Sequence, residues 1–205
     1  MKKLRILFFL WFLTAPLLTM CQDVEADGET ETVAEGFILP TPTAGKALII
    51  FTRPALEAPI TKFKYFCNDQ YLGKIGTGSY LVYECAPGRY LFWADSESTR
   101  LLKAEVAADK VYIVDTFVQS GGLRPILTLK PFDPEAKRAD RMRQRLVARI
   151  SKREEQRFDP GHTEQPSKRL QREARQIVKQ NSVDPVKGDG KGWSDVRIMD
   201  ASQHL

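Results

Sequence analysis

The sequence predicts a mainly β protein in which a small antiparallel β-sandwich precedes a basic α-helical extension. Residues 44–132 contain seven or eight short apolar or alternating segments, each ended by turn residues. This spacing is typical of a sandwich rather than of alternating strands and helices. Residues 133–181 then change to a helical period and are rich in arginine. A chain of 205 residues is long enough for one domain with a buried core and flanking tails.

The predicted strands follow one another at short intervals. The first is a short apolar run halted at Arg53-Pro54, as expected of a buried strand. Alternation marks the next strands, and Asn68-Asp69 and Pro87-Gly88 supply turn residues between them. A hairpin is expected across the turn at Asp109. The segments expected to form strands are 46–51, 63–67, 71–73, 80–85, 89–94, 101–106, 111–117 and 126–129.

Two helices are expected after the sandwich. Asp133-Pro134-Glu135 fits a helix start, since Asp can cap, Pro suits the first turn and an acid suits the helix dipole. A second helix is expected over 166–180, and 182–205 is expected to be a loose tail with a short segment at 196–199. The apolar positions of the two helices are Ala139, Met142, Leu146 and Ile150, then Leu170, Ala174, Ile177 and Val178.

The N-terminus has the features of an export signal. Lys2, Lys3 and Arg5 precede an apolar run over 6–18. The run is shorter than the roughly 20 apolar residues that span a bilayer, has no amphipathic face, and has the length of a signal-peptide core. Residues 1–20 are therefore predicted to be a signal peptide, and the protein is predicted to be exported.

Cys21 is the predicted site of lipidation. Leu18-Thr19-Met20-Cys21 has the order Leu-x-small-Cys that a lipoprotein signal peptidase recognises, except that Met20 replaces a small residue. One alternative is cleavage after Ala26 by the ordinary signal peptidase, which would give a soluble periplasmic or secreted protein. The other is an uncleaved N-terminal anchor. Residues 21–43 are acidic and poor in large apolar residues, so they are predicted to be a flexible tether. The residue after Cys21 is Gln22 rather than Asp, which favours sorting of the lipoprotein to the outer membrane in a Gram-negative cell.

The order of motifs within 44–132 resembles an uncharacterised family of bacterial lipoprotein domains related to the PEGA domain. The residues that carry the resemblance are Lys46-Ala47-Leu48-Ile49, Arg53-Pro54, Asn68-Asp69, Leu72-Gly73, Gly78-Ser79-Tyr80, Pro87-Gly88-Arg89-Tyr90, Tyr112 and Arg124-Pro125-Ile126-Leu127. The family usually has Asp-Gly at the turn where this chain has Asn68-Asp69-Gln70. The resemblance implies an immunoglobulin-like or PEGA-like sandwich on a lipid anchor, and it does not extend to the helices.

Four side chains of the sandwich are candidate functional residues. Cys67 and Cys85 fall on inward positions near strand ends, so they could form a disulfide in an oxidising compartment or remain buried thiols. Tyr80 and Trp93 fall on outward positions. They could form an exposed aromatic binding patch or be covered by the C-terminal helices.

An arginine row on the first helix is the candidate contact with an anionic surface. The row is formed by Arg138, Arg141, Arg145, Arg149 and Arg153. It could be the solvated side of a helix docked on the sandwich. It could also contact anionic phospholipid or lipopolysaccharide, at ~1 kcal/mol per basic residue, or an acidic helix of another protein.

The sequence offers no recognisable catalytic or metal motif. His162 and His204 lack the spacing of metal ligands, there is no nucleophile elbow, and no His lies in the sandwich to act as a base. No metal and no cofactor are therefore predicted. The expected function is a non-catalytic binding or assembly module, held on a membrane by its N-terminal lipid, whose partner is an envelope protein, peptidoglycan or anionic lipid. Nucleic acid does not suit an exported protein. The alternatives are an envelope-polymer hydrolase and a purely structural surface protein.

Overall fold

Strands are the most abundant regular elements of the described chain. The computed structural model describes residues 32–53, 62–96, 98–121, 124–161, 163–181 and 196–205. The predicted signal peptide, Cys21 and the first part of the tether lie outside these residues. The elements in chain order are β1 (Ala47–Thr52), β2 (Phe63–Cys67), β3 (Gln70–Ile75), β4 (Ser79–Cys85), β5 (Gly88–Asp95), β6 (Thr99–Val106), β7 (Val111–Gly121), β8 (Arg124–Pro131), α1 (Ala139–Ser151), β9 (Glu154–Arg157), α2 (Lys168–Gln180) and β10 (Val196–Met199).

The strands form two five-stranded sheets, with the orders β8-β7-β1-β4-β9 and β10-β6-β5-β2-β3. We call them sheet A and sheet B. Large side chains from both sheets share one buried cluster, so the sheets lie face to face. The mainly β class with two sheets, compatible with a sandwich, is confirmed. Each of the eight predicted strand segments overlaps one of β1 to β8.

Three strand pairs are parallel, which differs from the predicted antiparallel arrangement. They are β1 with β7, β4 with β9, and β6 with β10. Short turns force consecutive strands to run antiparallel, but they place no limit on strands joined through a whole sheet or a helix. Each parallel pair here joins strands that are far apart in the sequence.

The hairpin expected between 101–106 and 111–117 does not form. β6 pairs with β5 and β10, whereas β7 pairs with β1 and β8. The turn itself is present, because Asp109 has a φ of 60° and its backbone N–H donates to the Lys46 carbonyl at 2.7 Å. This turn therefore carries the chain from one sheet to the other.

The core between the sheets is dense in aromatic rings. The Phe51 ring lies 4.9 Å from that of Tyr65 and 5.6 Å from that of Phe92, measured between centroids. Each of these residues is fully buried. A contact between a strand of sheet A and two strands of sheet B fixes the spacing of the layers, since interiors are close-packed.

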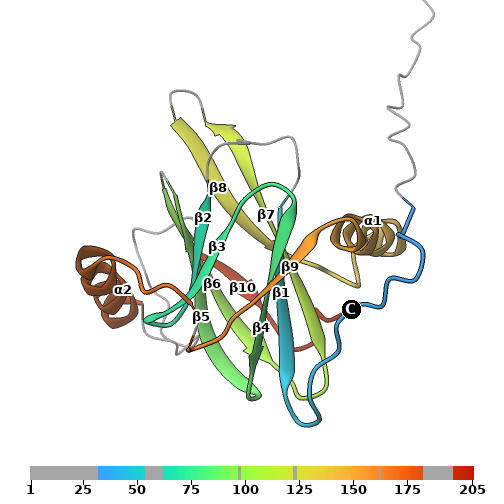
Figure 1. The fold of residues 1–205 in the computed structure, drawn as a ribbon, viewed down its shortest axis with the longest axis horizontal. Coiled ribbons are helices and arrows are strands. Elements are labelled where there is room, and N and C mark those ends of the chain that lie inside the picture. Colours follow the sequence, from blue (N-terminus) through green and yellow to red (C-terminus); the bar gives the residue numbers. More distant parts are fainter. Residues whose placement is uncertain (1–31, 54–61, 97, 122–123, 162, 182–195) are drawn as a thin grey trace, which may run out of the picture. The chain divides into compact units, whose positions relative to one another are not determined.

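A helix covers the outer face of each sheet. In α1, Leu146 and Ile150 pack with Leu48 and Ile50 of β1, on the side of sheet A away from the core. In α2, Leu170 and Ala174 are buried in a cluster on the outer side of sheet B. Figure 1 shows α1 and α2 on opposite sides of the two sheets. This arrangement explains why every residue of β1 is buried, since a strand covered on both faces needs apolar residues throughout.

The described part of the predicted tether lies on the domain. The backbone N–H of Ala34 donates to Ser151 Oγ at 2.8 Å, and Phe37 and Leu39 pack against the α1 cluster. Thr43 donates through its N–H and its hydroxyl to Glu84, both at 2.9 Å. Residues 32–43 are therefore part of the folded domain, which differs from the flexible segment predicted for 21–43.

The C-terminal third contains more than the predicted helices. β9 adds an edge strand to sheet A, and β10 adds one to sheet B. The predicted extension over 133–181 and the predicted loose tail over 182–205 therefore both contribute to the sheets. The short segment expected at 196–199 is confirmed as β10. The helix start is displaced, because Asp133 Oδ1 accepts from Glu135 N within a turn and α1 begins at Ala139.

The docking of α1 predicts unequal effects of two substitutions on that helix. Leu146 is 2% exposed in the α1 cluster, whereas Met142 is 38% exposed. We expect Leu146→Ala to lower the free energy of unfolding by about 2–5 kcal/mol, because it leaves a cavity. Met142→Ala, the matched control, is expected to change it by less than about 0.5 kcal/mol. Urea unfolding measures both, and equal effects would contradict the docking.

Candidate functional site

The predicted aromatic patch of Tyr80 and Trp93 is buried. Trp93 is 1% exposed and stacks on Phe66 with ring centroids 3.7 Å apart, beneath α2. Tyr80 is 3% exposed and packs in the α1 cluster, where its hydroxyl donates to Glu155 of β9 at 3.0 Å. Both side chains do point away from the core between the sheets, as alternation predicted. They are unavailable to a ligand because α2 and the α1–β9 segment cover them.

The two cysteines of the sandwich are free thiols in the structure. Cys67 at the end of β2 and Cys85 at the end of β4 are both buried in the core cluster. Burial raises the pKa of Cys67 to about 12 and that of Cys85 to about 11. Neither thiol is activated, since a reactive cysteine needs a lowered pKa. A disulfide between them stays a prediction.

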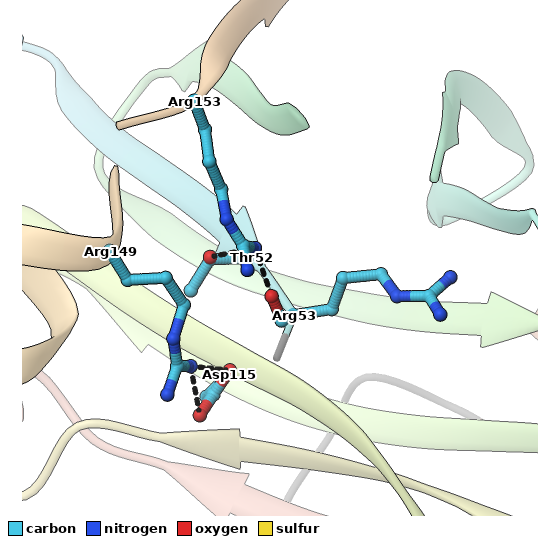
Figure 2. A network of polar contacts seen from close by, with 5 residues as sticks. All are labelled: Thr52, Arg53, Asp115, Arg149 and Arg153. Atoms are coloured by element: carbon cyan, nitrogen blue, oxygen red, sulfur yellow. Dashed lines mark hydrogen bonds and ion pairs between the residues drawn. The ribbon is translucent and has the colours of Figure 1, made fainter. Parts of the chain in front are cut away.

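The predicted arginine row on α1 divides into two parts. Arg138 and Arg141 are exposed and Arg145 is half-buried, so the first part of the row faces solvent. Arg149 and Arg153 lie at the other end and turn inward. There Arg149 meets Asp115 within β7, and Arg153 meets Thr52 and Arg53 at the end of β1, as Figure 2 shows.

The inward part of the row is an ion pair between α1 and sheet A. Arg149 Nη1 lies 2.9 Å from Asp115 Oδ1 and 2.9 Å from Oδ2, and both side chains are about one-fifth exposed. Burial raises the pKa of Asp115, and the neighbouring cations Arg149, Arg153 and Lys130 oppose that rise. Arg149 therefore keeps a partly buried carboxylate in its charged form, and it joins the last turn of α1 to β7.

Arg153 makes the second link, to the end of β1. Its Nη1 donates to the Arg53 carbonyl and, at 3.3 Å, to Thr52 Oγ1. The Arg53 side chain is fully buried, with its Cζ 4.1 Å from the centre of the Phe63 ring. Arg149 and Arg153 thus have structural contacts. The surface contact predicted for the whole row is open only to Arg138, Arg141 and Arg145.

A second basic surface lies on α2, and the sequence analysis did not identify it. Its members are all exposed and lie on the outward side of the helix: Lys168, Arg172, Arg175 and Lys179. We call this set the α2 stripe. Its spacing of i, i+4, i+7 and i+11 keeps all four within an arc of about 60° at 3.6 residues per turn. The same spacing can be read in the sequence KRLQREARQIVKQ. The sequence analysis used only the apolar positions of this helix, so it did not identify its basic side.

A polar cleft opens where the free edges of the two sheets meet. β3 is the last strand of sheet B and β9 the last strand of sheet A. The cleft between them has a volume of about 430 Å³, within the range of small-ligand sites. Lys62, Lys74 and Arg157 line it together with acidic residues, and Lys74 Nζ is paired with Glu164 at 3.0 Å. This mixture of charges suits a small polar ligand.

Two further findings concern metal ions and membrane spans. In the described ranges, no group of three or more His, Cys, Asp or Glu residues is placed to hold a metal ion. None of the described helices has both the length and the apolar character needed to cross a bilayer. His204 lies beside Tyr112, with ring centroids 6.3 Å apart, and His162 lies outside the described residues.

Loss of the Arg149 side chain is expected to make stability depend more strongly on pH. Without Arg149, burial raises the pKa of Asp115 further above its ordinary value of 3.8. The unfolded chain then releases this proton at lower pH than the folded protein, so stability falls as pH rises through the interval between the two pKa values. We expect Arg149→Met to cost about 2–3 kcal/mol at neutral pH and less at about pH 3.5.

Two controls accompany that measurement, which is urea unfolding across the acidic range. Arg145→Met, one turn earlier, removes a charge that has no ion pair in the described part of the chain, so it should leave the pH profile unchanged. Adding Asp115→Asn to Arg149→Met should abolish the extra pH dependence. A pH profile of Arg149→Met that parallels the wild type would contradict this account of the pair.

The buried thiols are expected to resist alkylation. With pKa values of about 12 and 11, Cys67 and Cys85 should react with iodoacetamide at pH 8 at least about 100-fold more slowly in the folded protein than in urea. Peptide mapping measures each thiol separately. Protection that persists in urea and disappears after reduction would instead show the disulfide between them.

Comparison of the chain with protein-family models gives no match, and comparison with curated proteins gives none either. The resemblance to PEGA-related lipoprotein domains therefore stays a prediction from the residues that carry it.

Proposed function

We propose that the protein is an exported, lipid-anchored component of a bacterial cell envelope that acts as a non-catalytic binding or assembly module. The sandwich in this proposal is of the PEGA-like type, and the membrane that holds it is the outer membrane. The partner is another envelope component, such as a protein, peptidoglycan or anionic lipid.

The order of segments at the N-terminus carries the proposal. A basic start and a short apolar run lead to Leu18-Thr19-Met20-Cys21, an order that fits export and lipidation of a cysteine. An acidic stretch follows, with Asp23, Glu25, Asp27 and Glu29 before the folded domain. A domain placed after such a segment would stand off the membrane that anchors it.

The distribution of side chains in the domain supports a binding role. Aromatic residues of both sheets are used in packing, and burial raises rather than lowers the pKa of both thiols. The two helices that cover the sheets, by contrast, present charged side chains to solvent. Long charged side chains on rigid helices suit the recognition of another macromolecule more than chemistry on a substrate.

Lipidation predicts the mass of the mature protein. The full-length chain expressed in a Gram-negative host is expected to yield Cys21–Leu205 with an acylated N-terminal cysteine. Intact-mass measurement of the membrane fraction checks this. Met20→Ala should increase the processed fraction, because it places a small residue before the cysteine.

Cys21→Ser is the matched control, and it should abolish the lipid adduct. A mature protein that begins at Asp27, without lipid, would contradict the anchor and support cleavage after Ala26. Retention of the uncleaved leader in both the wild type and Met20→Ala would contradict lipoprotein processing as well.

A further inference from the structure

We infer that the α2 stripe is a contact surface for the phosphate-bearing headgroups of an anionic membrane. The inference rests on the proposed envelope location. It names the partner of the domain and moves the basic contact from α1, where the sequence predicted it, to α2.

The fold presents the stripe outward and holds it rigidly. Leu170 and Ala174 are buried on the opposite side of α2, and Ile177 and Val178 pack partly against the same cluster. Ser167 caps the start of the helix through a bond from Leu170 N to its Oγ at 3.4 Å. Because the apolar side is fixed on sheet B, the helix cannot turn its cations away from solvent. The stripe extends over about 16 Å at 1.5 Å per residue.

The cations of the stripe are available, unlike those at the end of α1. Arg149 is paired with Asp115, and Arg153 is bonded to the end of β1. Within the described chain, none of the four members of the stripe forms an ion pair. The single acid among the exposed residues of α2 is Glu173. The stripe and the exposed Arg169 together set five basic side chains against this one carboxylate, so the surface keeps a net positive charge.

The composition of the surface favours a membrane over a protein partner. Protein interfaces depend on a few buried aromatic or apolar anchors near their centre. The exposed large hydrophobic residues of the described chain are Val33, Ile38 and Met142, and none of them lies on α2. Attraction to a negatively charged leaflet needs only basic side chains close to the surface. A row of Lys and Arg without an apolar anchor meets that requirement.

The mode of contact is electrostatic and reversible. An interfacial amphipathic helix inserts its apolar face into the lipid, but the apolar face of α2 is already buried against Trp93 and Phe66 of sheet B. The contact therefore depends on charge alone, and it should weaken steeply as salt screens it.

Vesicle binding of the full chain tests the inference. Binding is compared between phosphatidylcholine vesicles and vesicles that also contain phosphatidylglycerol, at ionic strengths of about 0.05 M and about 0.5 M. The N-terminal leader or lipid contributes to both kinds of vesicle, so the readout is the difference between them. The wild type should prefer anionic vesicles at low salt and lose that preference at high salt.

The decisive variant carries Lys168→Gln, Arg172→Gln, Arg175→Gln and Lys179→Gln. Each neutralised residue should lower the partition onto anionic vesicles by about fivefold, so the four together should lower it by about 600-fold. All four side chains are exposed, and thermal unfolding should show that the fold is retained. Arg172→Lys with Arg175→Lys, which keeps the charge, should bind within about twofold of the wild type.

A variant at α1 with the same change in charge distinguishes the effect of the stripe on vesicle binding from the effect of the net charge of the protein. It carries Arg138→Gln, Arg141→Gln, Arg143→Gln and Arg145→Gln, and it should keep the preference for anionic vesicles within about threefold. An equal loss in both variants would overturn the inference, because net charge would then explain binding. A wild type that shows no preference for anionic vesicles would also overturn the inference. So would a four-residue variant that binds anionic vesicles like the wild type but no longer retains an acidic envelope protein. Since none of these outcomes depends on Cys21, they are distinct from failure of the lipid anchor.

Discussion

Both sheets carry large apolar side chains on both of their faces, and this double burial is the constraint on which the rest of the structure depends. A two-sheet sandwich normally buries one face of each sheet and leaves the other polar. Here β1 is buried at every position, and β5 places Leu91 and Trp93 on the side away from the core. Without covering helices, these outer faces would expose continuous apolar surface. Residues 133–181 are therefore needed by the sandwich and are not an appendage to it.

The two covering helices, α1 and α2, are attached to the sheets in different ways. As a result, some basic side chains hold the fold together and others are available to a partner. α1 is fixed by apolar contacts, by the Arg149–Asp115 pair and by Arg153 at the end of β1. Breaking a partly buried pair leaves one charge poorly solvated, so those two arginines serve the fold. Within the described residues, α2 packs on sheet B through Leu170, Ala174 and their apolar neighbours, and its basic side chains form no ion pair with the sheet. Its charges take no part in its attachment, and they can change without loss of packing.

Local patterns in the sequence predict the strands well, because alternation and turn residues act over a few positions. Each expected strand segment from 46–51 to 126–129 overlaps an observed strand. Pairing is a long-range property, so the same patterns do not show that β6 and β7 belong to different sheets or that β9 and β10 enter them in parallel. The outward direction of Tyr80 and Trp93 follows from alternation, but their exposure depends on what covers them. The predicted surface contact of the arginine row is wrong at Arg149, because this residue pairs with Asp115 of β7, which is distant in the sequence.

The proposed anchor and the proposed contact surface each need the other. Attraction between exposed charges fades beyond about 8 Å at physiological salt, so four cations on a soluble protein would rarely find a membrane and would hold it weakly. A lipid at Cys21 would keep the domain near one leaflet and turn the contact of α2 into an intramolecular event at high effective concentration. A domain held only by its anchor would have no preferred orientation. The stripe would supply one, because it lies on a single helix fixed to sheet B, and the opposite cover, α1, would then face away from the lipid.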